Sequence, residues 1–201
     1  MITAVCLLAG FSTRMGQLKQ HVKLGDKTFL ERILCNLKKN SEYVEKIIMV
    51  GQASDFRSQA VSESLHISWI TNPAPEDGPL SSIKLALRHI EPESAMLLWP
   101  VDHPLVSNKT VAMLCREHCS NPDKIIVPSI DNRRGHPTIF PASLKAELSS
   151  ISLEEGAKKL LQLYPERIAH LVTTDVWVRK NLNNPQMLEE AEQYLQAMHQ
   201  S

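Results

Sequence analysis

The chain has 201 residues, 43% of them hydrophobic, and its 22 lysines and arginines balance 22 aspartates and glutamates. This composition is typical of a globular protein with one substantial core, so we expect a single domain over residues 1–201. Without net charge the chain has no overall field to draw it onto nucleic acid or an anionic membrane, and 5% aromatic residues are too few for a base-stacking surface.

The apolar runs are short. The run 95–99 is far below the roughly 20 residues that a membrane-spanning helix needs, and residues 1–9 carry neither a charged leader nor a cleavage site. We therefore expect a cytoplasmic protein, a monomer or weak dimer, with no nucleic-acid or membrane partner. Four cysteines in a chain of this size do not resemble a disulfide framework, so free thiols are expected.

Apolar patterning predicts alternating strands and helices. Continuous apolar runs indicate strands buried on both faces, and apolar residues spaced by three and four indicate amphipathic helices. In chain order the predicted elements are strand 2–9, helix 28–39, strand 46–51, helix 54–64, strand 66–70, helix 80–89, strand 95–99, helix 108–118, strand 125–127, strand 138–140, helices 141–148 and 155–163, strand 168–172 and a helix from 185. This alternation predicts an α/β fold, Rossmann-like, with three layers (α/β/α) and a mostly parallel central sheet.

The first candidate site is the loop 8–19, which follows the first predicted strand and contains two glycines, two hydroxyls and two cations. Ligands of open parallel sheets bind at the carboxyl ends of strands. Glycines let backbone N–H groups approach phosphate oxygens, Arg14 can make forked hydrogen bonds, and Lys19 can act as a point charge. The spacing fits neither the dinucleotide fingerprint nor the P-loop, so redox and P-loop chemistries are disfavoured.

Asp102 is the second candidate, because it directly follows strand 95–99 and lies between Pro100 and Pro104, which fix the local backbone. A carboxylate at this place can hold Mg²⁺. Nucleotidyl transfer needs such a cation to bridge triphosphate oxygens and to neutralise charge on the leaving pyrophosphate. A turn carboxylate that caps a helix is the alternative interpretation.

The run 8–19, read as L-A-G-x-S-x-R-M-G-x-x-K, closely resembles the nucleotidyltransferase signature of the MobA-like family, which includes molybdenum cofactor cytidylyltransferases and guanylyltransferases. The resemblance continues at 72–82, at 100–104 and at 134–137, and spans nearly the whole chain. It implies the fold of the nucleotide-diphospho-sugar transferases.

The resemblance also implies a role for each matching residue. Nucleotide binding is implied for Leu8, Ala9, Gly10, Ser12, Arg14, Met15, Gly16, Lys19, Gly78, Ser81 and Ser82. Catalysis is implied for Arg14, Lys19 and Asp102, with Mg²⁺ on Asp102. Contact with the pterin is implied for His103, Gly135, His136 and Pro137. For the two serines a helix cap, and for His136 an exposed turn, are the alternatives.

Within the family, the segment 135–137 and the absence of a Gly-x-Asp sequence after Gly16 resemble the cytidylyltransferase branch. The implied reaction is attack by the terminal phosphate of molybdopterin on the α-phosphorus of CTP, with release of pyrophosphate. A molybdoenzyme or its maturation chaperone is an expected partner. The alternatives are a guanylyltransferase, a sugar-phosphate nucleotidyltransferase of the same fold, or a non-catalytic homologue that binds the molybdenum cofactor.

The C-terminal segment departs from the family pattern. Where the family typically has Asp-Ile-Asp-Thr-Pro-Glu-Asp, this chain has Asn181, Asn183 and Met187 at positions of aspartates, and Gln186 in place of the glutamate. An amide offers a metal ion only a neutral oxygen, whereas a second carboxylate adds negative charge. The resemblance therefore implies a metal site weaker than the family's usual one.

Overall fold

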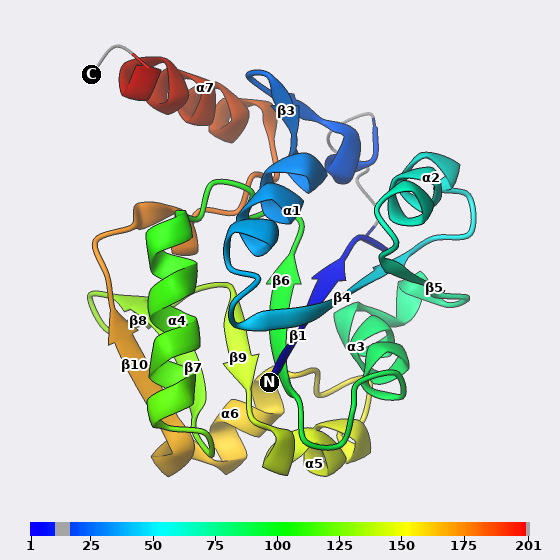
Figure 1. Ribbon diagram of the computed structural model, residues 1–201, viewed down its shortest axis with the longest axis vertical. Helices are drawn as coiled ribbons and strands as arrows, with labels where there is room; N and C mark the ends of the chain where they lie inside the picture. The colour runs from blue at the N-terminus through cyan, green and yellow to red at the C-terminus, as the bar shows by residue number, and fades with distance from the viewer. Residues whose placement is uncertain (11–16, 200–201) are drawn as a thin grey trace.

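A computed structural model describes residues 1–10 and 17–199 (Figure 1). Its strands are β1 (Ile2–Leu7), β2 (Lys23–Leu24), β3 (Lys27–Thr28), β4 (Val44–Gly51), β5 (Ser68–Thr71), β6 (Ala95–Pro100), β7 (Ile125–Ile130), β8 (Arg133–Arg134), β9 (Thr138–Phe140) and β10 (Ile168–Val172). Its α-helices are α1 (Phe29–Lys39), α2 (Phe56–Ser64), α3 (Pro79–Leu87), α4 (Asn108–Ser120), α5 (Lys145–Ser150), α6 (Lys158–Leu163) and α7 (Pro185–His199). Short 3₁₀ turns include η1 (Lys19–His21) and η5 (Val176–Val178).

One eight-stranded sheet forms the centre of the molecule, in the order β10-β7-β9-β6-β1-β4-β5, with β8 paired to β7. The strands β6, β1, β4 and β5 run parallel to one another, and β10 runs parallel to β7. The strand β9 lies between these two groups and is antiparallel to both β6 and β7. Figure 1 shows β1 and β6 pointing to one edge and β9 pointing away from it. The predicted α/β fold with a mostly parallel sheet is confirmed.

Both faces of the sheet are buried, which explains why its strands read as continuous apolar runs. In β1, Ala4 and Cys6 contribute to the core on the side of α1 and α4, while Val5 contributes to the core on the side of α3, α5 and α6. The three-layer arrangement is visible in Figure 1, with α1 and α4 in front of the sheet. These two cores fix the strand ends that carry the candidate site.

Several elements differ in their bounds from the prediction, and left-handed residues explain two of the differences. The sixth helix begins at Lys158 because Gly156, at φ +67°, interrupts the predicted start. The fifth strand begins at Ser68 after His66, which has φ +55°. The hairpin β2–β3 was not predicted; its turn contains Gly25 at φ +65°.

No helix in the described part of the chain is long and apolar enough to cross a membrane. All four cysteines are free, as expected from their number and spacing. Cys6 and Cys115 are buried, and burial raises the pKa of each thiol to about 12. These two thiols therefore serve the core as small apolar side chains.

Candidate active site

The sheet topology brings the predicted motifs to one edge. Lys19 belongs to the connection after β1, and Asp102 follows β6, the parallel neighbour of β1. The segment 135–137 connects β8 to β9 and directly precedes β9. Because β9 is antiparallel, the residues before it reach the same edge as the carboxyl ends of the parallel strands.

Lys19 and Asp102 meet at this edge. The Lys19 Nζ atom lies 3.6 Å from Asp102 Oδ2, and it also donates a hydrogen bond to Asn183 Oδ1. The backbone N–H of Leu182 donates to the carbonyl of Asp102 at 2.8 Å. Segments 164 residues apart in the chain thus converge on one carboxylate and one ammonium group. The C-terminal segment whose sequence differs from the family pattern therefore lies next to the predicted catalytic residues, with Asn183 beside Lys19.

Asp102 has one oxygen that the described residues leave without a hydrogen bond. That atom, Oδ1, is buried and lies 3.7 Å from Nε2 of His103. The described residues contain no group of three or more His, Cys, Asp or Glu side chains that could hold a metal ion. A carboxylate and the nearby amide oxygen of Asn183 fit Mg²⁺ only together with further oxygens, which a triphosphate can supply.

Two histidines lie beside the carboxylate. The rings of His103 and His136 are 5.1 Å apart between centroids and tilted by 53°. Burial lowers the pKa of His103, although Asp102 opposes the shift. Burial, together with His103, lowers the pKa of His136 to about 4. Both imidazoles are therefore neutral at pH 7, and the buried His136 Nδ1 has no hydrogen-bond partner among the described residues.

The backbone around His136 is held closely against η5. The N–H groups of Gly135 and His136 donate to Pro128 O at 2.8 Å and to Val178 O at 2.7 Å. A Cβ atom on Gly135 would lie 2.3 Å from that Val178 oxygen, so only glycine fits there. His103 is fixed to the same segment, since its Nδ1 lies 3.3 Å from Trp177 O. His136 is thus a packed, half-buried residue, and its exposed-turn interpretation is wrong.

The amino end of α3 completes the edge. Asn72, which is buried, donates to Ser81 Oγ at 2.8 Å and to Ser82 Oγ at 2.9 Å, and Ser81 donates to Gly78 O at 2.7 Å. These bonds fix the turn before the helix. At Gly78, with φ +82°, an added Cβ would meet no atom within 4 Å, so its surface is open. Gly78 is open to a ligand, whereas the two serine side chains belong to the Asn72 network.

The two described ends of the first loop are also anchored. Leu8 is buried, its N–H donates to Val50 O at 2.8 Å, and Ala9 O accepts a hydrogen bond from Gln52 Nε2 at 2.9 Å. Gly10 is exposed. Four predicted nucleotide-binding residues lie outside the described part of the chain: Ser12, Arg14, Met15 and Gly16.

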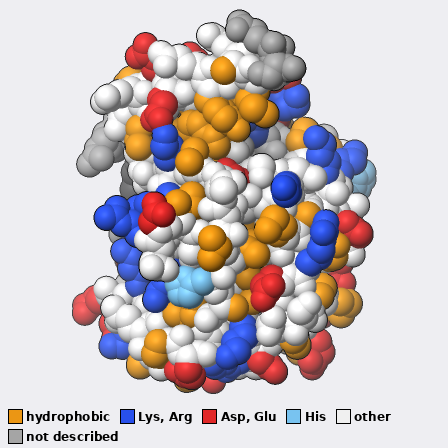
Figure 2. Space-filling view, turned by 90° about the vertical axis from the view of Figure 1, so that its left-hand side faces the viewer, with side chains coloured by type: hydrophobic (Ala, Val, Ile, Leu, Met, Phe, Trp, Pro, Cys, Tyr) orange, Lys and Arg blue, Asp and Glu red, His pale blue; other side chains and the backbone are white. Residues whose placement is uncertain are grey.

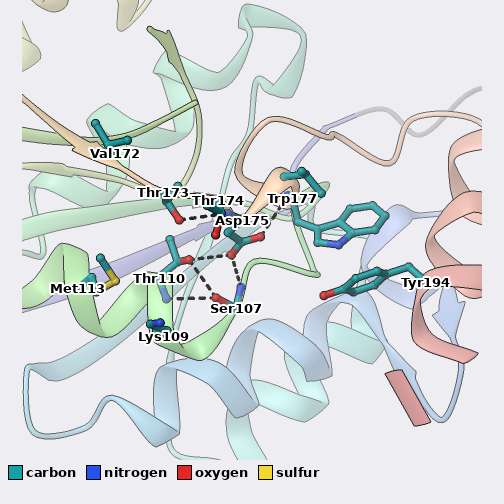
Figure 3. Close-up of a pocket in the computed structure, with 11 residues that line it drawn as sticks. Ser107, Lys109, Thr110, Met113, Val172, Thr173, Thr174, Asp175, Trp177 and Tyr194 are labelled. Carbon is teal, nitrogen blue, oxygen red and sulfur yellow. Dashed lines mark hydrogen bonds between the residues drawn. The ribbon is translucent and has the colours of Figure 1, made fainter. Parts of the chain in front are cut away.

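A separate cavity of about 460 Å³ lies between α4, the end of β10 and Tyr194 of α7 (Figure 3). On its wall, the Asp175 carboxylate accepts hydrogen bonds from Ser107 N and Thr110 Oγ1, both at 2.8 Å, and from Trp177 N at 3.1 Å, and so links η5 to the start of α4. Figure 2 shows apolar side chains gathered on this side of the molecule. The cavity is lined by neither Lys19, Asp102 nor His136, so it is not the predicted site.

This fold, with a lysine and a carboxylate at the carboxyl edge of a parallel sheet, defines a nucleotidyltransferase-like α/β protein. Residues 4–171 match the MobA-like NTP transferase domain, and the chain belongs to that family of nucleotidyltransferases. A curated relative is the molybdenum cofactor guanylyltransferase of Sinorhizobium fredii, 24% identical over 210 residues that cover 98% of this chain and 94% of the relative.

Solved structures share the fold. The crystal structure of Rv0371c from Mycobacterium tuberculosis superposes with a TM-score of 0.80 at 20% identity, covering 96% of this chain and 98% of that one. A complex of the same protein with manganese has a TM-score of 0.73 at 21% identity, covering 94% and 98%. Molybdopterin-guanine dinucleotide biosynthesis protein A from Archaeoglobus fulgidus has a TM-score of 0.72 at 21% identity, covering 98% and 100%.

The sequence singled out Lys19 and Asp102, and the structure brings these two side chains together. It missed Gln52 and Asp55, because nothing in their local sequence shows that they hydrogen-bond residues more than 30 positions away. It also missed Trp177, whose carbonyl meets His103. For Gln52 and Asp55, the available sequence signal was a polar turn at 51–55 that directly follows a buried strand.

Proposed function

We propose that this protein transfers a nucleotide from a nucleoside triphosphate to the terminal phosphate of molybdopterin and releases pyrophosphate. The observation that carries the proposal is the meeting of Lys19, Asp102 and Asn183 at the edge of the sheet where Gly78 and the ends of the first loop also lie. The family match and the name of the Sinorhizobium fredii relative support the reaction class and the acceptor.

Lys19 and Asp102 have complementary roles in this proposal. Lys19 would contact the triphosphate as a point charge, because its ammonium group already lies within 4 Å of the carboxylate that faces the same space. Asp102 and Asn183 would hold Mg²⁺ jointly with phosphate oxygens, and the bound ion would neutralise charge on the leaving pyrophosphate. No covalent enzyme intermediate is required, so positioning and charge neutralisation carry the rate.

The acceptor would lie beside His103 and His136. A neutral imidazole can donate from one ring nitrogen and accept at the other, as the donor and acceptor edge of a pterin requires. The buried Nδ1 of His136 has no partner among the described residues, and the half-buried ring leaves part of its surface open. We therefore propose that His103, Gly135, His136 and Pro137 form the acceptor side of the site.

We propose CTP as the triphosphate, on the resemblance of the first loop and of segment 135–137 to the cytidylyltransferase branch. GTP is the second candidate, and the name of the curated relative favours it. The described site residues suit either nucleotide, since Lys19 and Asp102 face the phosphates, which the two share. The base would be read by residues near Gly10 and Gly78.

The test measures pyrophosphate release by the purified chain with molybdopterin and Mg²⁺, with CTP and GTP supplied in separate reactions. Release with CTP at a kcat/KM at least tenfold above that with GTP is the expected result. The reverse ratio would select the guanylyltransferase. Release with a sugar 1-phosphate in place of molybdopterin would move the protein to the sugar-phosphate branch, and release with no acceptor would overturn the proposal.

A non-catalytic cofactor-binding homologue is a further candidate, favoured by the amide of Asn183 at the position of a family acid. The variant Asn183→Asp distinguishes an active enzyme with a weak metal site from a non-catalytic binding protein. An active enzyme with a weak metal site should need less Mg²⁺ for half-maximal rate once the carboxylate is restored. A binding protein should bind molybdopterin and show no turnover in either form.

A further inference from the structure

The short connection between β4 and α2, residues 52–55, hydrogen-bonds the segments on both sides of the first loop. On the amino-terminal side, Gln52 Nε2 donates to Ala9 O at 2.9 Å. On the carboxyl-terminal side, Asp55 Oδ2 accepts from Gln20 Nε2 at 2.5 Å, and Asp55 Oδ1 lies 2.7 Å from His21 Nε2. Gln20 and His21 directly follow Lys19 in the chain.

The connection is a fixed support. Asp55 N donates to Gln52 O at 3.1 Å, which closes a turn between the two anchoring residues. The Asp55 carboxylate also accepts Ser58 N at 3.1 Å and so caps α2. The anchors for the two sides of the loop are therefore three residues apart within one hydrogen-bonded turn, between the strand β4 and the helix α2.

Asp55 is suited to fix its partners because it is almost completely buried, with 2% exposure, as is Gln20 with 1%. Burial acts to raise the pKa of Asp55, but the hydrogen bonds from Gln20, Ser58 and His21 hold it below its ordinary value. A buried carboxylate is stable only while it is hydrogen-bonded. Moving Gln20 or His21 away would leave this charge unsatisfied.

The carboxyl-terminal anchor determines where the backbone of Lys19 lies. His21 N donates to Leu18 O and Val22 N donates to Lys19 O, both at 3.0 Å, so residues 18–22 form one tight turn. From that turn the Lys19 side chain reaches Asp102 and Asn183. A shift of the turn would move the ammonium group relative to the carboxylate at the other side of the site.

We propose that Gln52 and Asp55 are positioning residues of the nucleotide site, which hold Ala9 and Lys19 at a fixed separation for a bound triphosphate. The inference rests on the proposed function for its ligand, and on the hydrogen bonds above for its geometry. Misplacement of a reacting group by about 1 Å can cost about a hundredfold in rate. Loss of the Asp55 contacts should therefore lower turnover without unfolding the chain.

The variant Asp55→Asn tests the proposal, because asparagine still caps α2 and fills the same volume, while its amide N–H₂ opposes a donor of Gln20 or His21. We expect kcat to fall by about tenfold or more and the KM for the triphosphate to rise, with the KM for molybdopterin unchanged. A general structural defect would change both KM values. Unchanged kcat would overturn the proposal.

A matched control is Glu117→Gln, which makes the same carboxylate-to-amide change at the carboxyl end of α4, where Glu117 Oε1 accepts a hydrogen bond from Asn121 Nδ2 at 2.8 Å, away from residues 18–22 and from η5. We expect its kinetic constants to equal those of the wild type. In a Lys19→Ala background, Asp55→Asn should weaken binding of the triphosphate with Mg²⁺ by less than twofold, because the group that it positions is gone. An equal loss in both backgrounds would mean that Asp55 does not act through Lys19.

Amide hydrogen exchange measures how firmly Asp55 holds the turn 18–22, and it requires no nucleotide. In Asp55→Asn, the amides of His21 and Val22 should exchange at least tenfold faster, while those of β1 and β4 keep their protection. Unchanged exchange would overturn the positioning role. If the wild type binds no triphosphate, the proposed function fails, and this exchange measurement alone still decides whether Asp55 holds the turn.

Discussion

The two halves of the candidate site are built differently. The half that we propose for the nucleotide, around Lys19 and Asp102, consists of charged side chains that reach into a shared space from anchored backbone. The half that we propose for the acceptor, around His136, consists of neutral imidazoles and a glycine packed directly against the backbone of Val178. One half supplies charge and the other a closely packed, neutral surface, a difference that suits the triphosphate and the flat heterocycle of the proposed function.

This difference means that substitutions should affect the two halves in different measurements. A change in the nucleotide half alters a charge that the fold does not need, so activity falls and stability is kept. A change in the acceptor half alters packing or a buried titrating group, so stability changes first. The following predictions are ordered from the largest expected effect to the smallest.

The largest effect is expected for Asp102→Asn. Its backbone carbonyl still accepts Leu182 N, so the fold is kept, while the carboxylate that the proposed function assigns to Mg²⁺ is lost. We expect kcat/KM to fall by about a thousandfold, equivalent to about 4 kcal/mol of transition-state stabilisation. Asp131→Asn, an exposed change in the β7–β8 turn, is the control. Calorimetric titration of Mg²⁺ and triphosphate that matches the wild type would contradict the assignment.

Gly135→Ala should be the most destabilising change in the acceptor half. The new Cβ would lie 2.3 Å from Val178 O and force that backbone apart, which we expect to cost about 1–3 kcal/mol in urea unfolding. Gly156→Ala is the matched control: its site is open, and only its φ of +67° opposes alanine, for about 1 kcal/mol. A loss at Gly135 no larger than that at Gly156 would show that η5 can move away.

The smallest effect is a pH dependence of stability from His136. Its folded pKa is about 4, below the value near 6.5 of an unfolded histidine, so the unfolded chain binds more protons between these values. Stability should therefore fall as the pH drops from 7 to 5, by about 1–2 kcal/mol from this residue. His136→Asn should remove that part of the pH dependence when the free energy of unfolding is measured at pH 7 and at pH 5. His89→Gln, which replaces an exposed histidine, should leave the pH dependence unchanged.

The sequence was sufficient for the sheet because strands such as β1 and β6 are buried on both faces and read as apolar runs. It also predicted β9 with its observed bounds, but not its antiparallel direction, since an apolar pattern of three residues carries no information on strand direction. The rule for strand ends singled out the segments of Lys19 and Asp102 separately, and only the structure shows that the two side chains meet. The contacts of Asp55 with Gln20 and of Lys19 with Asn183 depend on tertiary packing between distant segments, which no local pattern reveals.

The reversed strand β9 has a consequence for cooperativity. The strands β5, β4, β1 and β6 form one parallel block and β7 with β10 forms another, and the strand pairing of the described residues links the two blocks through the three residues of β9. Asp102 extends from the first block, and Gly135 pairs with the end of the second. A ligand that contacts both blocks would add a second connection between them. Ligand binding at this edge would then be thermodynamically linked to the unfolding of the whole sheet.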